Sequence, residues 1–191
     1  MLEDDIKPNK KEYKFLNLAY NRFFELTDKI SDENFWEKSS EIRLLYIKDL
    51  ISIYTELLNY EPIQHFIEKI RKKRPPLEAE ISSDLLKFIR NIFVHFPVFN
   101  SWNEMYINLD LCTWNKNTGY IAKFIDKYKN NNVLKYRIWL HKEKRMVYID
   151  INFPVLLNTE KIYLRDLIEE HNGTIFLIGV MSNVLKSQLI Y

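Results

Sequence analysis

The sequence predicts a mainly α-helical protein, a helical bundle with one added β-hairpin. Apolar residues recur at helical spacing through most of the first half. Only 3 Gly and 6 Pro are present among 191 residues, which is too few for the many tight turns of an all-β fold. One segment, at about 134–153, instead alternates apolar and polar residues with the period of a strand. A chain of this length is expected to form a single domain, here residues 1–191.

The first half of the chain predicts four helices joined by short connections. The first spans 10–30, and its apolar positions at helical spacing are Phe15, Leu18, Ala19, Phe23 and Leu26. The second spans 39–60, with Ile42, Leu45, Leu50, Ile53 and Leu57 in the same role. Pro62 suits the first turn of a third helix, which the sequence KRPP ends. The fourth runs from about Leu77 to Phe96, and four such helices favour a bundle.

The second half mixes helices with the hairpin. Ser101 and Glu104 resemble a capping box, so a short helix is expected at Trp102. Another helix is expected over 117–129. The hairpin strands place Tyr136, Ile138 and Leu140, and then Val147, Ile149, Ile151 and Phe153, on one face. Because two strands alone are marginal, the hairpin must pack on helices. A helix over 160–171, a stop at Asn172–Gly173 and a very apolar helix over 174–190 complete the prediction.

The amino-acid composition argues against several classes of protein. Cys112 is the only cysteine, which excludes an intrachain disulfide and a cysteine-based metal site. The first residues lack the apolar core of a secretory signal, and no apolar run approaches the roughly 18 residues of a membrane span. The chain also lacks a phosphate-binding glycine loop and a zinc-binding histidine motif. We therefore expect a cytoplasmic protein with no membrane association, no metal and no cofactor.

The fourth predicted helix carries the most informative segment, LLKFIRNIFVHFPVFNSW at 85–102. At 100° per residue its polar side chains form one stripe. The stripe contains Asp84, Lys87, Asn91 and His95, with Arg90 at its edge. The simplest interpretation is a solvated face. However, Val94 lies on the same side, between Arg90 and Lys87, which indicates a partly covered face, as at a cleft or a dimer contact.

Within this segment, Arg90-Asn91-Ile92-Phe93-Val94-His95 resembles the R-x(4–6)-H signature of HEPN domains, which are all-helical nucleotide- and RNA-binding modules. The resemblance implies a HEPN-like bundle. It also implies a metal-independent endoribonuclease of a toxin–antitoxin or phage-defence system, with an active site formed by two motifs across a homodimer. RNA would be the substrate and an antitoxin a candidate partner. In this scheme Arg90 holds the phosphate, His95 is the general acid/base and Asn91 orients the reacting groups.

The chemistry agrees with these roles. Cutting RNA without a metal requires the 2′-hydroxyl to attack the adjacent phosphate while the leaving 5′-oxygen gains a proton. Histidine moves protons near neutral pH, and arginine holds phosphate oxygens in a fork. On an ideal helix Arg90 lies about 140° from His95, so one copy converges poorly on a single phosphate. A two-fold dimer presents both groups to one cleft.

Alternatives remain at three places. Arg165 and His171 match the same spacing, but the simpler interpretation is surface charge, with His171 at the C-terminal end of its helix. The candidate RNA-binding cations are Lys87, Arg137, Lys144 and Arg145, and the hairpin aromatics Tyr136, Trp139 and Tyr148 could stack bases. The same hairpin charges also suit a turn that keeps a strand edge soluble. The alternative function is therefore a non-catalytic helical module that binds RNA or a partner protein.

Overall fold

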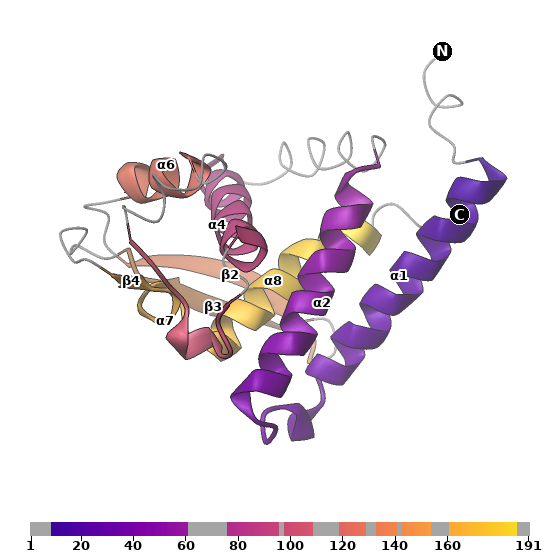
Figure 1. Ribbon diagram of the computed structural model, residues 1–191, viewed down its shortest axis with the longest axis horizontal. Coiled ribbons are helices and arrows are strands. Elements are labelled where there is room, and N and C mark those ends of the chain that lie inside the picture. The colour runs from indigo at the N-terminus through magenta and orange to yellow at the C-terminus, as the bar shows by residue number, and fades with distance from the viewer. Residues whose placement is uncertain are drawn as a thin grey trace, which may run out of the picture. The chain divides into compact units, whose positions relative to one another are not determined.

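The computed structural model describes residues 9–60, 76–95, 98–108, 119–128, 133–140, 143–153 and 161–186. Within these ranges the protein is mainly helical with an antiparallel β-hairpin, which confirms the predicted fold class (Figure 1). The chain divides into two compact units. Unit 1 comprises Met1–Lys73 with Met181–Tyr191, and unit 2 comprises Arg74–Val180. None of the described helices is both long enough and apolar enough to cross a membrane. The single domain expected over 1–191 stays a prediction.

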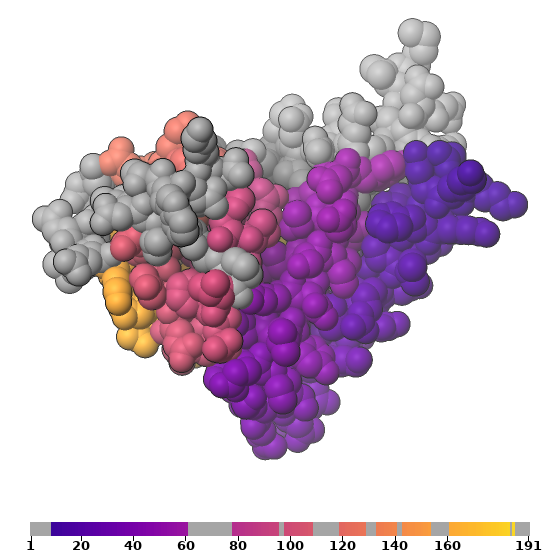
Figure 2. All heavy atoms as spheres, in the orientation of Figure 1, coloured from indigo at the N-terminus to yellow at the C-terminus, as the bar shows by residue number. Residues whose placement is uncertain are grey.

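Unit 1 is built around two helices, α1 (Lys10–Ile30) and α2 (Ser40–Leu58), linked by a 3₁₀ turn at Glu33–Phe35. A capping box starts α1, because the Asn9 side chain accepts from the Glu12 amide and the Glu12 carboxylate accepts from the Asn9 amide. The two helices pack on each other (Figures 1 and 2). Their buried side chains include Leu16, Phe23, Leu26, Ile30, Leu44, Ile47, Leu50, Ile51, Tyr54 and Leu57.

Four residues expected in this core are exposed instead: Phe15, Leu18, Ile42 and Leu45. The helices themselves lie where the sequence predicts them, and Phe23, Leu26, Leu50 and Leu57 are buried as expected. Each helix buries a stripe centred on one side, so apolar residues beyond the edge of that stripe remain in water. The periodicity therefore predicted the helices correctly but placed part of the buried face wrongly. The third predicted helix, which begins near Pro62, lies outside the described residues.

Unit 2 contains α4 (Pro76–His95), a 3₁₀ turn (Trp102–Glu104), α6 (Gly119–Tyr128) and two small sheets. The hairpin consists of β2 (Leu134–Leu140) and β3 (Arg145–Ile151), in the register from Leu134↔Ile151 to Leu140↔Arg145. Its inner face packs on α8 (Glu170–Lys186), where the ring of Tyr136 lies 5.2 Å from that of Phe176 (Figure 1). The predicted hairpin and its helical support are both confirmed. From Met181 onward, α8 belongs to unit 1.

The helix predicted over 160–171 is wrong. Its described residues form strand β4 (Ile162–Tyr163), which pairs antiparallel with β1 (Tyr106–Ile107), and a single turn, α7 (Leu164–Leu167). Ile168 is extended, and α8 begins only at Glu170. Pairing with a strand over 50 residues earlier overrides the helical pattern of this segment, which local periodicity does not reveal. His171 therefore lies in the first turn of α8, not at the C-terminal end of a helix.

The predicted stop at Asn172–Gly173 is also wrong, since both residues lie inside α8. Gly173 instead makes room for Trp102, which is fully buried and donates a hydrogen bond from Nε1 to the Ile168 carbonyl at 3.0 Å. A Cβ atom on Gly173 would lie 2.4 Å from Cζ2 of that indole. The predicted cap at Ser101 is confirmed, because its hydroxyl accepts from the Glu104 amide.

Candidate functional site

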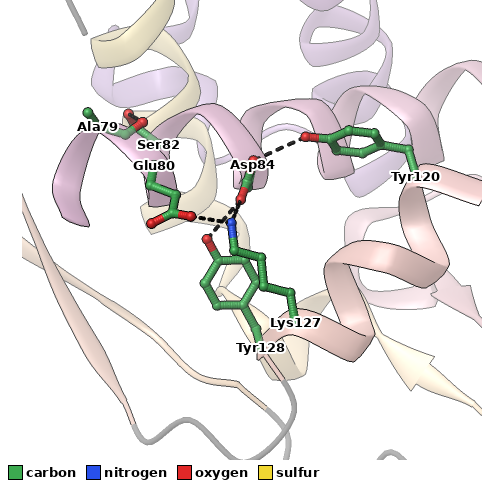
Figure 3. A network of polar contacts seen from close by, with 7 residues as sticks. All are labelled: Ala79, Glu80, Ser82, Asp84, Tyr120, Lys127 and Tyr128. Carbon is green, nitrogen blue, oxygen red and sulfur yellow. Dashed lines mark hydrogen bonds and ion pairs between the residues drawn. The ribbon is translucent and has the colours of Figure 1, made fainter. Parts of the chain in front are cut away.

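Helix α4 carries the polar stripe, and α6 covers the first part of it. The Asp84 carboxylate accepts from the Lys127 ammonium at 2.6 Å and from the hydroxyls of Tyr120 at 3.1 Å and Tyr128 at 3.0 Å (Figure 3). The Lys87 ammonium lies 5.2 Å from the centre of the Tyr120 ring. Helix α6 of the same chain therefore covers this end of the stripe, whereas Val94, whose position suggested a covered face, is 55% exposed.

The groups of this network keep one protonation state near neutral pH. Burial alone would raise the pKa of Asp84, but the hydrogen bonds from Lys127, Tyr128 and Tyr120 outweigh it and lower the pKa below its usual value. Burial and the hydrogen bond to Asp84 raise the pKa of Tyr128. The pKa of Lys127 is also raised, because bonds to Asp84 and Glu80 outweigh its burial. None of these shifts moves a group toward neutral pH, so the network is a structural clamp and not an acid–base pair.

An aromatic layer supports the same contact between α4 and α6. The Phe88 ring stacks on that of Phe124, with 4.3 Å between centroids. Tyr128 continues the layer, at 4.8 Å from Phe124 and 4.7 Å from Phe153. These contacts make α4 a rigid support for the residues at its C-terminal end.

The other part of the stripe differs. Arg90, Asn91 and His95 are each half-buried, and none forms a hydrogen bond or ion pair with another residue that the structure describes. Asn91 and His95 lie one turn apart on the same face, whereas Arg90 points about 140° away from His95. This end of α4 is anchored by Phe93, whose ring lies 5.9 Å from that of Trp102. The anchored helix therefore presents three polar groups that no described residue engages.

The second Arg–His pair is also linked to Trp102. The Arg165 guanidinium lies 4.4 Å from the centre of the Tyr163 ring and donates to the Asn103 carbonyl at 2.9 Å. Asn103 follows Trp102 directly, and Trp102 packs against Gly173, two residues after His171. The segments that carry both motifs thus meet around one indole. Arg165 is a partly exposed, anchored surface residue, as the simpler interpretation of the sequence expects.

Three of the four predicted RNA-binding cations have partners within the chain. Arg137 forms an ion pair with Glu78 at 2.8 Å, Arg145 pairs with Glu143, and Lys87 lies over Tyr120. Lys144 is exposed at the turn, with a positive φ of 50°. Glu78 lies in the first turn of α4 and His95 is its last residue, so about 25 Å of helix separates them. The hairpin cations and the Arg–Asn–His motif therefore do not form one site.

The hairpin aromatics divide between its two faces. Tyr136 points inward and is buried, so it is not available to stack bases. Trp139 and Tyr148 point outward, as does Met146, which was not predicted as a candidate. Alternation along β3 would have identified Met146, since it has the same parity as Tyr148.

The described residues contain no group of three or more His, Cys, Asp or Glu side chains able to hold a metal ion. His65, Cys112, Trp114 and His141 lie outside them. Comparison of the chain with protein-family models, curated proteins and solved structures found no match.

Proposed function

We propose that the protein is a metal-independent endoribonuclease of HEPN type, with Arg90, Asn91 and His95 as its active-site residues. The contrast along α4 carries this proposal. Asp84 is bound to α6 by three hydrogen bonds, whereas the three motif residues, on the same rigid helix, keep polar groups unengaged by any described residue. Unengaged, half-buried Arg, Asn and His side chains on a fixed support are suited to binding and catalysis.

The reaction assigns one task to each residue. His95 takes the proton from the 2′-hydroxyl, whose oxygen then attacks the neighbouring phosphorus. The bond to the 5′-oxygen breaks, and that oxygen receives the proton from His95. The products are a 2′,3′-cyclic phosphate and a 5′-hydroxyl. Arg90 binds the phosphate oxygens where negative charge builds up, and Asn91, one turn before His95, orients the imidazole.

A homodimer is part of the proposal because Arg90 and His95 diverge within one copy. In a two-fold dimer, Arg90 of one copy and His95 of the other face the same phosphate. Val94 and Val98, both exposed close to the motif in the sequence, would be covered by such a contact. A phage-defence or toxin–antitoxin role in the cytoplasm, with an antitoxin as partner, follows from the family resemblance.

The test is cleavage of total RNA in excess EDTA by the wild type, His95→Ala and the matched control His171→Ala. We expect the wild type and the control to cut, leaving 2′,3′-cyclic phosphate ends. His95→Ala should be slower by about 10²–10⁴, the usual contribution of a general acid–base. Thermal melting establishes that each variant is folded. Intact RNA with the wild type, or equal cleavage by His95→Ala, would remove His95 from the chemistry.

A second candidate function is RNA binding without cleavage. It is favoured by the outward-facing Trp139 and Tyr148 of the hairpin, which no catalytic scheme requires. Under this alternative the wild type binds RNA and leaves it intact, and His95→Ala binds equally well.

A further inference from the structure

The outer face of the hairpin combines exposed aromatic rings with cations. It consists of Lys135, Arg137 and Trp139 on β2 and Met146, Tyr148 and Asp150 on β3, and all six are exposed. In the strand register, Arg137 lies opposite Tyr148 and Trp139 lies opposite Met146. We propose that this face, the hairpin platform, binds single-stranded RNA by stacking bases on Trp139 and Tyr148. The choice of RNA as the nucleic acid rests on the proposed function.

Trp139 and Tyr148 are more exposed than most aromatic residues of unit 2. Its other large aromatic side chains are mostly packed, as Trp102, Phe88 and Tyr136 show. Trp139 is 45% exposed and Tyr148 is 64% exposed, and neither contacts another ring among the described residues. Large aromatic groups that are partly held in water on a regular strand have ring surface available to a ligand.

The positions of the rings suit consecutive bases. Trp139 and Tyr148 are diagonal neighbours on adjacent strands, because each lies opposite a residue two positions from the other. Such neighbours are about 7–8 Å apart, which leaves room for one base on each ring. Sheet faces with exposed aromatic residues bind single strands in this manner, since every base offers a π-face. A duplex keeps its bases stacked on each other and would not fit the rings.

The charge of the hairpin favours a polyanion over an apolar partner. Its described residues contain four cations, Lys135, Arg137, Lys144 and Arg145, and two anions, Glu143 and Asp150. These described residues alone therefore carry a net charge of +2, equal to that of the whole chain. Arg137 is oriented by Glu78 yet keeps 45% of its side chain exposed, beside Tyr148. With three apolar side chains set among charges, the face is small for a stable protein interface, which needs about 1,000 Å² or more.

The platform lies apart from the motif. Arg137 pairs with the first turn of α4, about 25 Å along the helix from His95. At about 3.4 Å per nucleotide of a stacked strand, this distance corresponds to about seven nucleotides, or fewer if the strand is extended. The platform would therefore anchor an unpaired RNA segment several nucleotides from the cut.

The test is fluorescence anisotropy of the full chain with a single strand of about 16 nucleotides, a length that covers a typical single-strand site. A 2′-O-methyl RNA is used because it lacks the attacking hydroxyl and stays intact. We expect Trp139→Ala and Tyr148→Ala each to weaken binding about 10-fold. Tyr148→Phe should bind like the wild type, whereas Tyr148→Leu should resemble Tyr148→Ala. Met146→Ala is the matched control on the same face, with 46% exposure, and should change the affinity less than about 2-fold.

Several outcomes would overturn the platform. These are no binding by the wild type, unchanged affinity in both alanine variants, or a leucine variant as good as phenylalanine, which would show that an aromatic ring is not needed and reject base stacking. The cleavage assay separates the two proposals. Loss of binding in the platform variants, with no cleavage by the wild type, keeps the platform and rejects the nuclease. Cleavage by the wild type, with an unchanged KM in the platform variants, keeps the nuclease and rejects the platform.

Discussion

Gly173 is required by packing and not by backbone conformation. Its φ is not positive, but an added Cβ would lie 2.4 Å from the buried indole of Trp102. We predict that Gly173→Ala lowers the free energy of unfolding by about 1–3 kcal/mol, despite the better helix propensity of alanine. Gly119 in α6 has nothing within 4 Å of an added Cβ. Gly119→Ala is therefore the control and should be neutral or stabilising by up to about 1 kcal/mol. Urea denaturation of both variants measures the difference.

The same residue shows why the helix stop was predicted wrongly. Asn172 and Gly173 next to a charged stretch form a common helix stop, and only the tertiary approach of Trp102 explains a glycine inside α8. Trp102 itself is fully buried. The motif residues were identified from their spacing and from their place on the fourth predicted helix. Their partial burial depends on how α4 packs in the fold. The contacts of Asp84 and Lys87 with α6 could likewise be seen only in the structure, because the sequence does not show which helix lies beside α4.

The geometry of the phosphate contact predicts the behaviour of Arg90→Lys. Lysine keeps the positive charge but loses the planar fork that binds two phosphate oxygens, so cleavage should fall by about 10-fold or more. The matched control is Arg165→Lys, which changes the second Arg–His motif and should leave cleavage within about 2-fold of the wild type. Initial rates at low RNA concentration measure both. A loss in the control with none in Arg90→Lys would transfer the active site to the second motif.

At the level of elements, Asp84 joins α4 to α6 and makes that contact sensitive to pH. Its pKa is lower in the folded state than in the unfolded chain, where a value near 3.9 is usual. The ionised form therefore stabilises the fold. This contribution is complete above about pH 5 and is lost as the pH falls through the folded-state pKa.

We accordingly predict that Asp84→Asn lowers the free energy of unfolding by about 1–2 kcal/mol near pH 7, because three hydrogen bonds lose a charged acceptor. The difference from the wild type should shrink as the pH falls through the folded-state pKa of Asp84. Denaturation series at several pH values measure this. Asp49→Asn, an exposed change in α2, is the control and should show a difference near zero throughout. A constant difference at all pH values would contradict the linkage.

Elements were predictable where the local pattern and the tertiary contacts agree. The hairpin alternates over seven residues in each strand, and its inner face meets the apolar α8, so the choice of buried residues follows from the sequence. Strand β4 has only two residues and exists through its pairing with β1. No pattern of period two can be recognised over so short a segment. On α1 the periodicity located the helix, but the neighbour that selects the buried stripe was not visible.

At the level of the whole molecule, all candidate functional residues belong to unit 2. The Arg90–His95 motif, Arg165 and His171, and the hairpin platform all lie between Arg74 and Val180. Helices α1 and α2 carry none of them. The catalytic proposal therefore depends on what one copy of unit 2 cannot provide, namely an arginine and a histidine that face the same phosphate.

This requirement predicts complementation between inactive copies. Co-refolding Arg90→Ala with His95→Ala in equal amounts yields mixed dimers as about half of all dimers, and each has one intact pair of Arg90 from one copy and His95 from the other. We expect recovery of about a quarter of wild-type cleavage, against almost none for either variant alone. The control mixes His95→Ala with a variant that carries both Arg90→Ala and His95→Ala. Neither copy then supplies His95, so this mixture should stay inactive. If analytical ultracentrifugation shows dimers but the first mixture is also inactive, the arginine and the histidine do not act across the dimer.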